Sequence, residues 1–273
     1  MNYIVAIQGE TGSFMHEAAK QWYGQDVIIK PCATFAEIFK SLDAGDASCA
    51  VVAIENSIHG SINEVYDLLL NHKYPIVGEI NLPIKQCLIT FKGIKCKDIK
   101  YVHSHHVALS QCSDFLDTYL PHAKRVMSPD DTAGSVRFIK ELGDKYRAAI
   151  ASEGAAKLYD MPIYKKNIQN NDVNVTRFVV LDPSGQQKNT TKSSLVLQTN
   201  HKPGALYNAL GVFEQNNINL TKLQSRPIVG SLWRYMFYID AEITKSQLKK
   251  VKKILTKQGC SVQILGTYNP AKL

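Results

Sequence analysis

Residues 49–70 read CAVVAIENSIHGSINEVYDLLL and contain a strand, a polar turn and a helix in succession. The run Cys49–Ile54 is apolar and rich in branched side chains, which predicts a buried strand. The run Ser61–Leu70 has the apolar spacing of a helix, and Ser61 with Glu64 predicts a capping box at its start. A buried strand followed by a capped helix is the repeating unit of an α/β fold with a largely parallel sheet.

The same alternation of strand and helix patterns continues through the first 181 residues. Thr34 and Glu37 predict a second capping box, at the start of the helix Thr34–Leu42. Further strands are predicted at Tyr3–Gln8, Ile76–Ile80, Cys87–Phe91, Lys124–Met127, Ala148–Ala151 and in FVVL (178–181), and further helices at Ser13–Tyr23, Val107–Leu120, Thr132–Leu142 and Glu153–Leu158. Strands separated by helices at this spacing predict α/β architecture.

A polar, turn-rich stretch at 183–192 is typical of a linker, and the pattern changes after it. The predicted order becomes strand, helix, strand, strand, helix, strand, which is that of a ferredoxin-like unit. These six elements are predicted at Ser194–Thr199, Gly204–Gln215, Ile218–Ser225, Leu232–Ala241, Lys245–Leu255 and Cys260–Leu265. The sequence therefore predicts two domains within its 273 residues.

Composition argues against several classes of protein. The net charge of +8 comes mainly from dispersed lysines, and the densest group lies on one face of the predicted helix Lys245–Leu255, which is typical of a solvated face. No nucleic-acid-binding motif accompanies the charge. Six scattered cysteines without a Cys-x-x-Cys pair predict reduced thiols, and the eight histidines lack metal-ligand spacing. No signal peptide or membrane span is recognisable, so we expect a cytoplasmic protein without membrane or nucleic-acid partners.

Polar residues gather in three loops that are predicted to follow strands. The loop GETGSF (9–14) suits either an anion site or a plain turn capped by Ser13. The triplet Glu55-Asn56-Ser57 follows the strand Cys49–Ile54 at the end where ligands bind in open α/β sheets, although Asn56 and Ser57 could also brace the turn.

The third loop, NVTRF (174–178), places Thr176 and Arg177 at the mouth of a strand. Arginine is scarce in the first 190 residues, and its guanidinium makes a forked contact with a carboxylate, although a structural ion pair is the plainer alternative. Together the three loops supply hydroxyls, an amide, a carboxylate and one arginine. This set suits the binding of a small carboxylate compound and proton movement by hydrogen bonding, without cofactor or metal.

With these stretches in view, the chain resembles the prephenate dehydratases that carry a C-terminal ACT domain. The resemblance spans nearly the whole chain and is specific because its motifs occur in order: GETGSFMHEAA (9–19), AIENSIHGSINEVYDLL (53–69), SHHVALSQC (104–112), DTAGSV (131–136), AAIASEGAAKLY (148–159), NIQNNDVNVTRFVVL (167–181), HKPGALYNAL (201–210) and LQSRP (223–227). It implies a catalytic domain at 1–183 with a two-lobed fold like that of periplasmic binding proteins, and an ACT domain at 193–270. The implied lobes are about 1–77 plus 168–182, and 78–167.

The resemblance also implies a lyase that converts prephenate to phenylpyruvate, with loss of water and carbon dioxide, in phenylalanine biosynthesis and without a cofactor. Thr176 would be catalytic and ease the departing hydroxide by hydrogen bonding. Arg177 would hold a substrate carboxylate and Phe178 would pack the apolar wall. The implied contacts to substrate oxygens come from Ser13, Asn56 and Ser57, while Glu55 either orients its neighbours or donates a proton if buried.

The same resemblance implies feedback regulation by L-phenylalanine through the ACT domain. The implied effector residues are Gly204, Ala205 and Leu206 at a helix start, and Gln224, Ser225, Arg226 and Pro227. The family usually has glutamate at the position of Gln224, a proline before Glu55-Asn56-Ser57, and proline and glutamine at His106 and Val107. Since ACT domains usually pair, a homodimer or homotetramer is implied.

Two alternatives remain open at the level of the sequence. An arogenate dehydratase would act on the same ring with an amine in place of the keto group. A non-catalytic, amino-acid-responsive protein with a solute-binding fold is the second, and the intact Thr176-Arg177-Phe178 argues against it.

Overall fold

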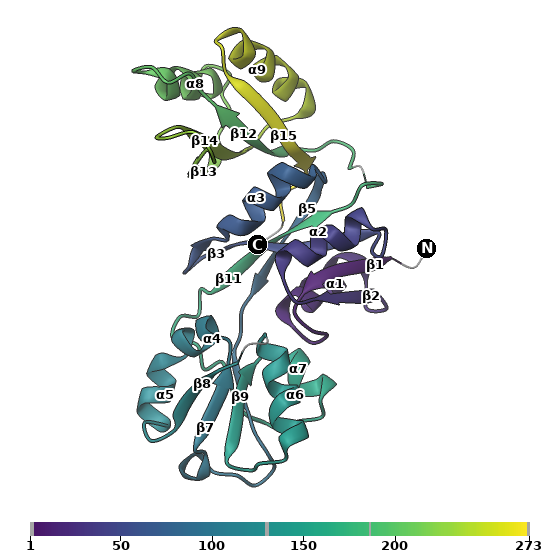
Figure 1. Cartoon of the computed structure of the whole chain (residues 1–273), viewed down its shortest axis with the longest axis vertical. Coiled ribbons are helices and arrows are strands. Elements are labelled where there is room, and N and C mark those ends of the chain that lie inside the picture. Colours follow the sequence, from purple (N-terminus) through teal and green to yellow (C-terminus); the bar gives the residue numbers. More distant parts are fainter. Residues whose placement is uncertain (1–2, 129–130, 186, 272–273) are drawn as a thin grey trace. The chain divides into compact units, whose positions relative to one another are not determined.

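The computed structural model describes residues 3–128, 131–185 and 187–271 (Figure 1). The chain divides into two compact units, each of which uses two segments of sequence. Unit 1 consists of Met1–Val65 and Ile80–Phe178, and unit 2 of Tyr66–Glu79 and Val179–Leu273. Two strands, β5 (Ile76–Pro83) and β11 (Val175–Leu181), therefore begin in one unit and end in the other.

The first sheet of unit 1 has its strands in the order β11-β3-β1-β2, and the pairs of β1 with β2 and with β3 are parallel. These strands are β1 (Ile4–Gln8), β2 (Ile28–Cys32) and β3 (Cys49–Asn56), with the helices α1 (Phe14–Tyr23) and α2 (Phe35–Asp43) between them. The apolar run predicted as a strand is fully buried in β3, as expected for a strand covered on both faces. The polar ends of β1, β3 and β11 carry the three loops singled out above.

The second sheet of unit 1 has the order β10-β6-β9-β7-β8. Its strands are β6 (Cys87–Ile89), β7 (Tyr101–Ser104), β8 (Lys124–Met127), β9 (Arg147–Ala151) and β10 (Ile163–Lys166), and a 3-10 turn, η1 (Cys96–Asp98), precedes β7. Ala148 and Ile150 of β9 pack in one core with α4 (His106–Gln111) and α5 (Ser113–Tyr119). Ala149 and Ala151 pack in another with α6 (Thr132–Leu142) and α7 (Glu153–Leu158). Because side chains alternate along a strand, both faces of this sheet are covered by helices (Figure 1).

Unit 2 contains the six C-terminal elements in the predicted order of strand, helix, strand, strand, helix and strand. They are β12 (Lys192–Gln198), α8 (Ala205–Glu214), β13 (Leu220–Pro227), β14 (Tyr235–Ala241), α9 (Lys245–Lys257) and β15 (Ser261–Tyr268). The strands pair antiparallel in the order β13-β14-β12-β15, and β15 continues to β5 in parallel at Gly266 and Ile76. Leu195 and Leu197 of β12 pack against Phe213 of α8 and Leu255 of α9. The helix α3 (Asn63–His72) contributes Tyr66, whose carbonyl accepts from the Tyr238 hydroxyl at 3.1 Å.

Several predicted elements differ from the structure for local reasons. Ser61 lies in a short strand before the helix: Gly60 has φ 77°, Gly60–Ser61 form β4, which pairs back on Glu55 and Asn56, and α3 begins at Asn63. The predicted helix 107–120 is two helices that meet at Cys112. Thr34 does cap α2, but Glu37 accepts from the Ala33 amide rather than from that of Thr34.

The strands β2, β7 and β10 were not predicted; β2 and β10 lie at the edge of their sheets, whereas β7 is an inner strand of only four residues. β2 contains Pro31, and β10 ends in two lysines, so neither shows the buried pattern of an inner strand. The predicted linker also ends earlier than expected, because Lys192 belongs to β12 and is buried; Gln186 lies outside the described residues.

Among the described residues, no helix is both long and apolar enough to cross a bilayer. The described part of the chain also holds no cluster of three or more His, Cys, Asp or Glu side chains that could bind a metal ion.

Candidate active site

A cavity of about 410 Å³ in unit 1 is lined by residues from all three polar loops. Ser13 and Asn56 reach it from the carboxyl ends of β1 and β3, and Thr176 and Phe178 reach it from the start and the middle of β11. The remaining wall comes from the stretch that links β5 to β6 and from the starts of α4 and α6. Carboxyl ends of strands in α/β sheets are the usual place for a ligand, and the predicted convergence of these loops is observed.

The Asn56 side chain organises the loop around Thr176. Its Nδ2 donates to Asn174 Oδ1 at 2.8 Å and to Thr176 Oγ1 at 3.0 Å. Its Oδ1 accepts from the backbone amides of Ile58 and His59, each at 3.0 Å. If the Asn56 amide were reversed, its Oδ1 would face Asn174 Oδ1, and its NH₂ group would face the backbone N–H groups of Ile58 and His59. These contacts therefore fix the orientation of the Asn56 amide.

The Asn56 contact determines how the Thr176 hydroxyl is used. Because Thr176 Oγ1 accepts the Asn56 N–H, one of its lone pairs is occupied while its own O–H remains a donor. Thr176 and Phe178 both line the cavity, as residues two apart on a strand should. The side chain of Phe178 is 2% exposed and forms an apolar wall next to the hydroxyl.

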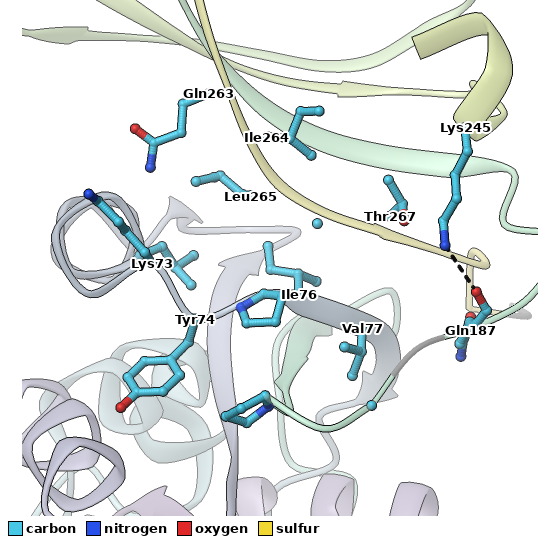
Figure 2. A pocket seen from close by; sticks show the side chains of 15 residues that line it. Lys73, Tyr74, Ile76, Val77, Gln187, Lys245, Gln263, Ile264, Leu265 and Thr267 are labelled. Atoms are coloured by element: carbon cyan, nitrogen blue, oxygen red, sulfur yellow. Dashed lines mark hydrogen bonds between the residues drawn. The ribbon is translucent and has the colours of Figure 1, made fainter. Parts of the chain in front are cut away.

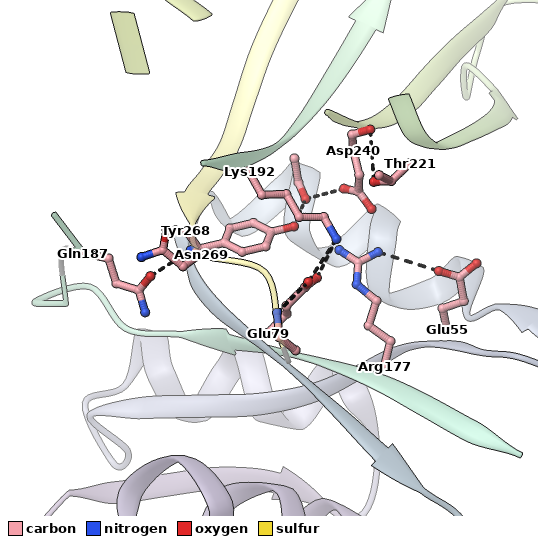
Figure 3. A network of polar contacts seen from close by, with 11 residues as sticks. Glu55, Glu79, Arg177, Gln187, Lys192, Thr221, Asp240, Tyr268 and Asn269 are labelled. Carbon is pink, nitrogen blue, oxygen red and sulfur yellow. Dashed lines mark hydrogen bonds and ion pairs between the residues drawn. The ribbon is translucent and has the colours of Figure 1, made fainter. Parts of the chain in front are cut away.

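Arg177 lies on the other face of β11, and this differs from the predicted contact with a substrate in the Thr176 cavity. Its Nη1 is 3.7 Å from Glu55 Oε2, and neither residue is among those that line the cavity (Figure 3). The cause is the alternation of side chains along a strand: Arg177 alternates with Thr176 on β11 as Glu55 alternates with Asn56 on β3. Of the two roles predicted for Glu55, the structure supports orientation of a neighbour.

Ser57 braces the turn after β3 rather than lining the cavity. Its Oγ donates to the Val173 carbonyl and accepts from the Val175 amide, each at 3.0 Å. The Ser57 amide also donates to the Val175 carbonyl at 2.9 Å. This is the bracing alternative considered from the sequence, and it holds the Asn56 loop against the start of β11.

Ser13 combines a capping role with a place in the cavity wall. Its Oγ accepts from the His16 amide at 3.3 Å at the start of α1, and its side chain is buried. His16 in turn accepts the Gly12 amide at Nδ1, at 2.9 Å. Burial, with a contribution from Lys20, lowers the pKa of His16 to about 4, so this ring is neutral at pH 7 and can serve as an acceptor.

Glu10, in the first loop, binds Arg137 of α6 and Tyr159 at the end of α7. Its carboxylate accepts from Arg137 at 2.6 and 3.0 Å and from the Tyr159 hydroxyl at 2.9 Å. Burial raises the pKa of Glu10, but the bonds from Arg137 and Tyr159 outweigh it and the pKa lies below its ordinary value. The loop is therefore held in place by an ion pair. The negative charge of the Glu10 carboxylate in this loop argues against the anion site considered from the sequence.

Sequence reasoning missed a chain of polar side chains along the cavity wall. Gln86 Nε2 donates to Gln111 Oε1 at 3.5 Å, and Gln111 Nε2 lies 3.3 Å from His59 Nδ1. His59 Nδ1 is also 3.4 Å from Asn56 Oδ1, so the chain reaches the Thr176 loop. These residues come from separate segments, and although His59 and Gln111 fall within the quoted motifs, only their arrangement in space shows the connection.

Two further cavities are lined by described residues of unit 2. One, of about 580 Å³, lies between β5, the end of α3 and β15, where Lys245 donates to the Gln187 carbonyl at 3.4 Å (Figure 2). None of the predicted site residues is among those that line it. The other, of about 720 Å³, is lined by Ala205 and its neighbours at the start of α8.

The predicted effector residues occupy two elements of unit 2. Gly204 adopts φ 77° just before α8, and the Ala205 amide donates to the Lys202 carbonyl at 3.1 Å. Gln224, Ser225, Arg226 and Pro227 form the end of β13, where Arg226 pairs with Asp67 of α3. Among the described residues that line the cavity at α8, Ala205 is the one predicted effector residue from the start of α8, and no residue of 224–227 is present. The described residues of one chain therefore do not bring both predicted motifs to that cavity.

Comparison with known proteins gives one consistent family. A family model described as prephenate dehydratase matches residues 5–186. The bifunctional chorismate mutase/prephenate dehydratase of Escherichia coli (strain K12) is 36% identical over 272 residues, which are 97% of this chain and 70% of that protein. Arogenate dehydratase 2 of Petunia hybrida is 36% identical over 284 residues, with 97% of this chain and 71% of that protein covered.

Solved structures agree over nearly the whole chain. The prephenate dehydratase from Staphylococcus aureus subsp. aureus Mu50 has a TM-score of 0.83 at 31% identity, covering 98% of this chain and 100% of that one. A prephenate dehydratase from Arthrobacter aurescens in complex with L-Phe has a TM-score of 0.86 at 28% identity, covering 97% and 89%. A quorum-quenching acylase, GqqA, has a TM-score of 0.87 at 29% identity, covering 98% of both chains.

Proposed function

The chain belongs to the prephenate dehydratase family, and we propose that its reaction takes place in the unit 1 cavity around Thr176. The protein is an enzyme of the lyase class in aromatic amino acid biosynthesis, which converts prephenate to phenylpyruvate with loss of water and carbon dioxide. The placement of the reaction rests on one observation: the Asn56 amide donates to Thr176 Oγ1 and leaves the hydroxyl proton of Thr176 for a ligand.

The barrier to the reaction lies chiefly in the loss of the hydroxide leaving group. Prephenate carries its ring hydroxyl opposite the carbon that bears a carboxylate and the pyruvyl side chain. As carbon dioxide leaves, the electrons of its bond enter the ring, and the carbon–oxygen bond breaks with its electrons on oxygen. The ring becomes aromatic, but hydroxide is a poor leaving group. A positioned O–H that hydrogen-bonds to this oxygen stabilises the developing charge, and solvent then supplies the proton that completes water.

The side chains around Thr176 take the following proposed roles. Thr176 donates to the departing oxygen, and Asn56 holds Thr176 and its loop. Phe178 packs against the ring, and Ser13 contributes a hydroxyl to the wall. Arg177 and Glu55 act as positioning residues through their ion pair between β11 and β3, and Ser57 does so by bracing the turn.

The activity is tested with purified protein and prephenate. We expect phenylpyruvate to appear with equimolar carbon dioxide and without an added cofactor. Folded protein, checked by a cooperative thermal transition, that forms no phenylpyruvate would contradict the assignment of substrate. The bifunctional relatives also carry chorismate mutase in their names, and this chain spans about 70% of their length, so the assay starts from prephenate.

We also propose that the C-terminal module of unit 2 is an ACT domain, with the predicted limits 193–270, and that it binds L-phenylalanine. Its order of elements and its antiparallel sheet support the ferredoxin-like architecture expected of such a domain. The similar structure from Arthrobacter aurescens contains L-Phe. The catalytic domain would then comprise 1–183, with its two lobes built on the two sheets of unit 1.

Phenylalanine binding has a direct test. Calorimetric titration with L-phenylalanine should give saturable heat, and the same amino acid should lower the rate of phenylpyruvate formation, because an effector that prefers a less active state shifts the population toward it. L-Alanine serves as the matched control without the aromatic ring. Absence of both heat and inhibition at millimolar phenylalanine would refute the effector role.

Pairing of two chains stays a prediction, and the surface of unit 2 supports it. β13 is an edge strand, and Leu223 and Tyr235 on β13 and β14 are 46% and 42% exposed. The hairpin between these strands exposes Val229, Leu232 and Trp233 by 95%, 86% and 77%. An apolar edge of this kind is usually covered, and we propose that a second copy of this chain covers it in a homodimer or homotetramer.

A further inference from the structure

The active-site cavity has no fixed positive charge for its substrate among the described residues. Prephenate carries two carboxylates, one on the ring and one on the pyruvyl side chain. Of the described residues that line the cavity, Asp131 is the one carboxylate, and none is a lysine or an arginine. Transfer of a dianion from water to such a wall is unfavourable, because the charge loses hydration without gaining a partner. A positive charge in this part of the wall therefore has to come from one of its two histidines, His59 or His105.

Its surroundings hold His105 in the neutral form. The Nδ1 atom of His105 accepts from the Val107 amide at 3.4 Å where α4 begins, and a proton on Nδ1 would break this contact. Burial, together with the charge of His106, lowers the pKa of His105 below its ordinary value. His59, in contrast, is exposed and also lines the cavity, so solvent can protonate it.

Contacts on one side of the His59 ring favour a proton on Nδ1. Asn56 Oδ1 already accepts two backbone amides, and it lies 3.4 Å from His59 Nδ1. If Gln111 donates to Nδ1 at 3.3 Å, two lone pairs meet at Asn56 and the buried Gln86 Oε1 has no partner. With both glutamine amides reversed, Nδ1–H faces two amide oxygens and Gln111 donates to the Gln86 oxygen. Because buried polar atoms are nearly always paired, the second arrangement is favoured, and it leaves His59 Nε2 for a ligand.

The other charged groups around His59 do not supply a cation to the cavity. Arg177 pairs with Glu55 at 3.7 Å, and neither Arg177 nor Lys85 lines the cavity. The Asp131 carboxylate accepts from the Gly134 and Glu10 amides at 2.7 and 2.8 Å. The remaining titratable groups on the segments next to the His59 turn and the cavity wall are Glu64, His105, His106 and Asp172.

The separation of His59 from Thr176 agrees with the structure of prephenate. Asn56 lies between them, with Nδ2 at 3.0 Å from Thr176 Oγ1 and Oδ1 at 3.4 Å from His59 Nδ1. In prephenate the hydroxyl and the two carboxylates are attached at opposite ends of the ring. A group that binds a carboxylate while Thr176 binds the hydroxyl therefore has to stand apart from Thr176, as His59 does.

Of the two carboxylates, the one on the side chain suits a cation better. The ring carboxylate leaves as carbon dioxide and passes its electrons to the ring, so a cation bound to it would stabilise the substrate more than the transition state. The side-chain carboxylate keeps its charge throughout and remains in phenylpyruvate. A contact with it holds the substrate without opposing the loss of carbon dioxide.

We propose that protonated His59 donates from Nε2 to the side-chain carboxylate of prephenate and holds the end of the substrate opposite the Thr176 hydroxyl. This inference rests on the proposed placement of the reaction at Thr176. Because the contact is the same in substrate, transition state and product, its loss should raise KM and leave kcat nearly unchanged. The affinity for phenylpyruvate, which keeps this carboxylate, should fall by the same factor as KM rises.

The test combines prephenate kinetics with calorimetric binding of phenylpyruvate at about pH 6 and about pH 8.5, on either side of the range in which histidine usually loses its charge. In wild type, KM and the Kd for phenylpyruvate should both rise about 10-fold between these values, as expected for loss of one hydrogen bond to a charged group. His59→Gln should show the high values at both pH values. His59→Lys, which stays charged throughout, should show the low ones. His122→Gln removes an exposed histidine outside the described cavity wall and should behave like wild type.

The outcomes separate this proposal from the assignment of the reaction. Wild-type affinity for phenylpyruvate that does not change with pH would overturn the role of His59, and this result needs no variant to fold. A glutamine variant that loses kcat rather than KM, or that raises KM while it binds phenylpyruvate normally, would overturn it as well. So would a lysine variant that binds as weakly as the glutamine variant at both pH values. Wild type that forms no phenylpyruvate from prephenate would instead defeat the proposed function.

Discussion

Replacement of Thr176 with valine should lower kcat for prephenate by about 10²–10³-fold, which is the usual cost of removing one donor from a developing oxyanion. Valine matches threonine in shape and keeps the β-branched side chain of β11, so the fold should survive. KM should change far less than kcat, because the bond to the departing oxygen strengthens only as charge develops on it. Steady-state measurement of phenylpyruvate formation gives both constants.

Thr176→Ser is the matched control for this experiment. Serine keeps a hydroxyl that can accept from Asn56 Nδ2 and donate into the cavity, so its kcat should lie much closer to wild type than that of valine. Equal losses in the serine and valine variants would show that the hydroxyl alone does not account for the loss. Retention of full turnover by the valine variant would remove the catalytic role of Thr176.

Glu79→Leu should lower the free energy of unfolding of the protein by about 3–5 kcal/mol, since it leaves a buried ammonium without its carboxylate. Lys192 Nζ lies 3.0 Å from both oxygens of Glu79, and the two side chains are 11% and 3% exposed (Figure 3). Both residues belong to unit 2, where Glu79 also accepts the Ala271 amide at 3.0 Å. Urea unfolding followed by circular dichroism measures the change.

The double variant Glu79→Leu/Lys192→Met provides the control for burial of charge. Since apolar residues of similar volume often replace a buried ion pair at little cost, the double variant should recover most of the stability that the single variant loses. A single variant that loses less than about 1 kcal/mol, the range of exposed ion pairs, would show that water reaches Lys192 in the folded protein.

The sequence was most informative where local pattern decides structure. Strand and helix alternation identified most elements of unit 1, and the order of the six C-terminal elements is as predicted. The edge strands β2 and β10 were missed because Pro31 and the terminal lysines obscure their pattern, and the inner strand β7 was missed because it is only four residues long. The two-residue strand β4 was not predicted, because its pairing depends on the turn at Gly60.

The candidate site shows the same division between local and tertiary information. The convergence of Ser13, Asn56 and Thr176 followed from the position of loops at strand ends. Arg177 was placed beside Thr176 because the two are adjacent in sequence, although adjacent residues on a strand face opposite sides. The contact of Gln86 with Gln111 could not be found from sequence, because it joins side chains from two separate segments.

A crystal structure of the slow Thr176→Val variant with prephenate bound tests the central claim most directly. We predict that the ring oxygen lies on the Asn56 side of the cavity, at the hydrogen-bond distance of about 2.6–3.2 Å from the position that the Thr176 hydroxyl occupies in wild type. The claim would be contradicted by prephenate bound with its ring oxygen at another wall and a different donor against it.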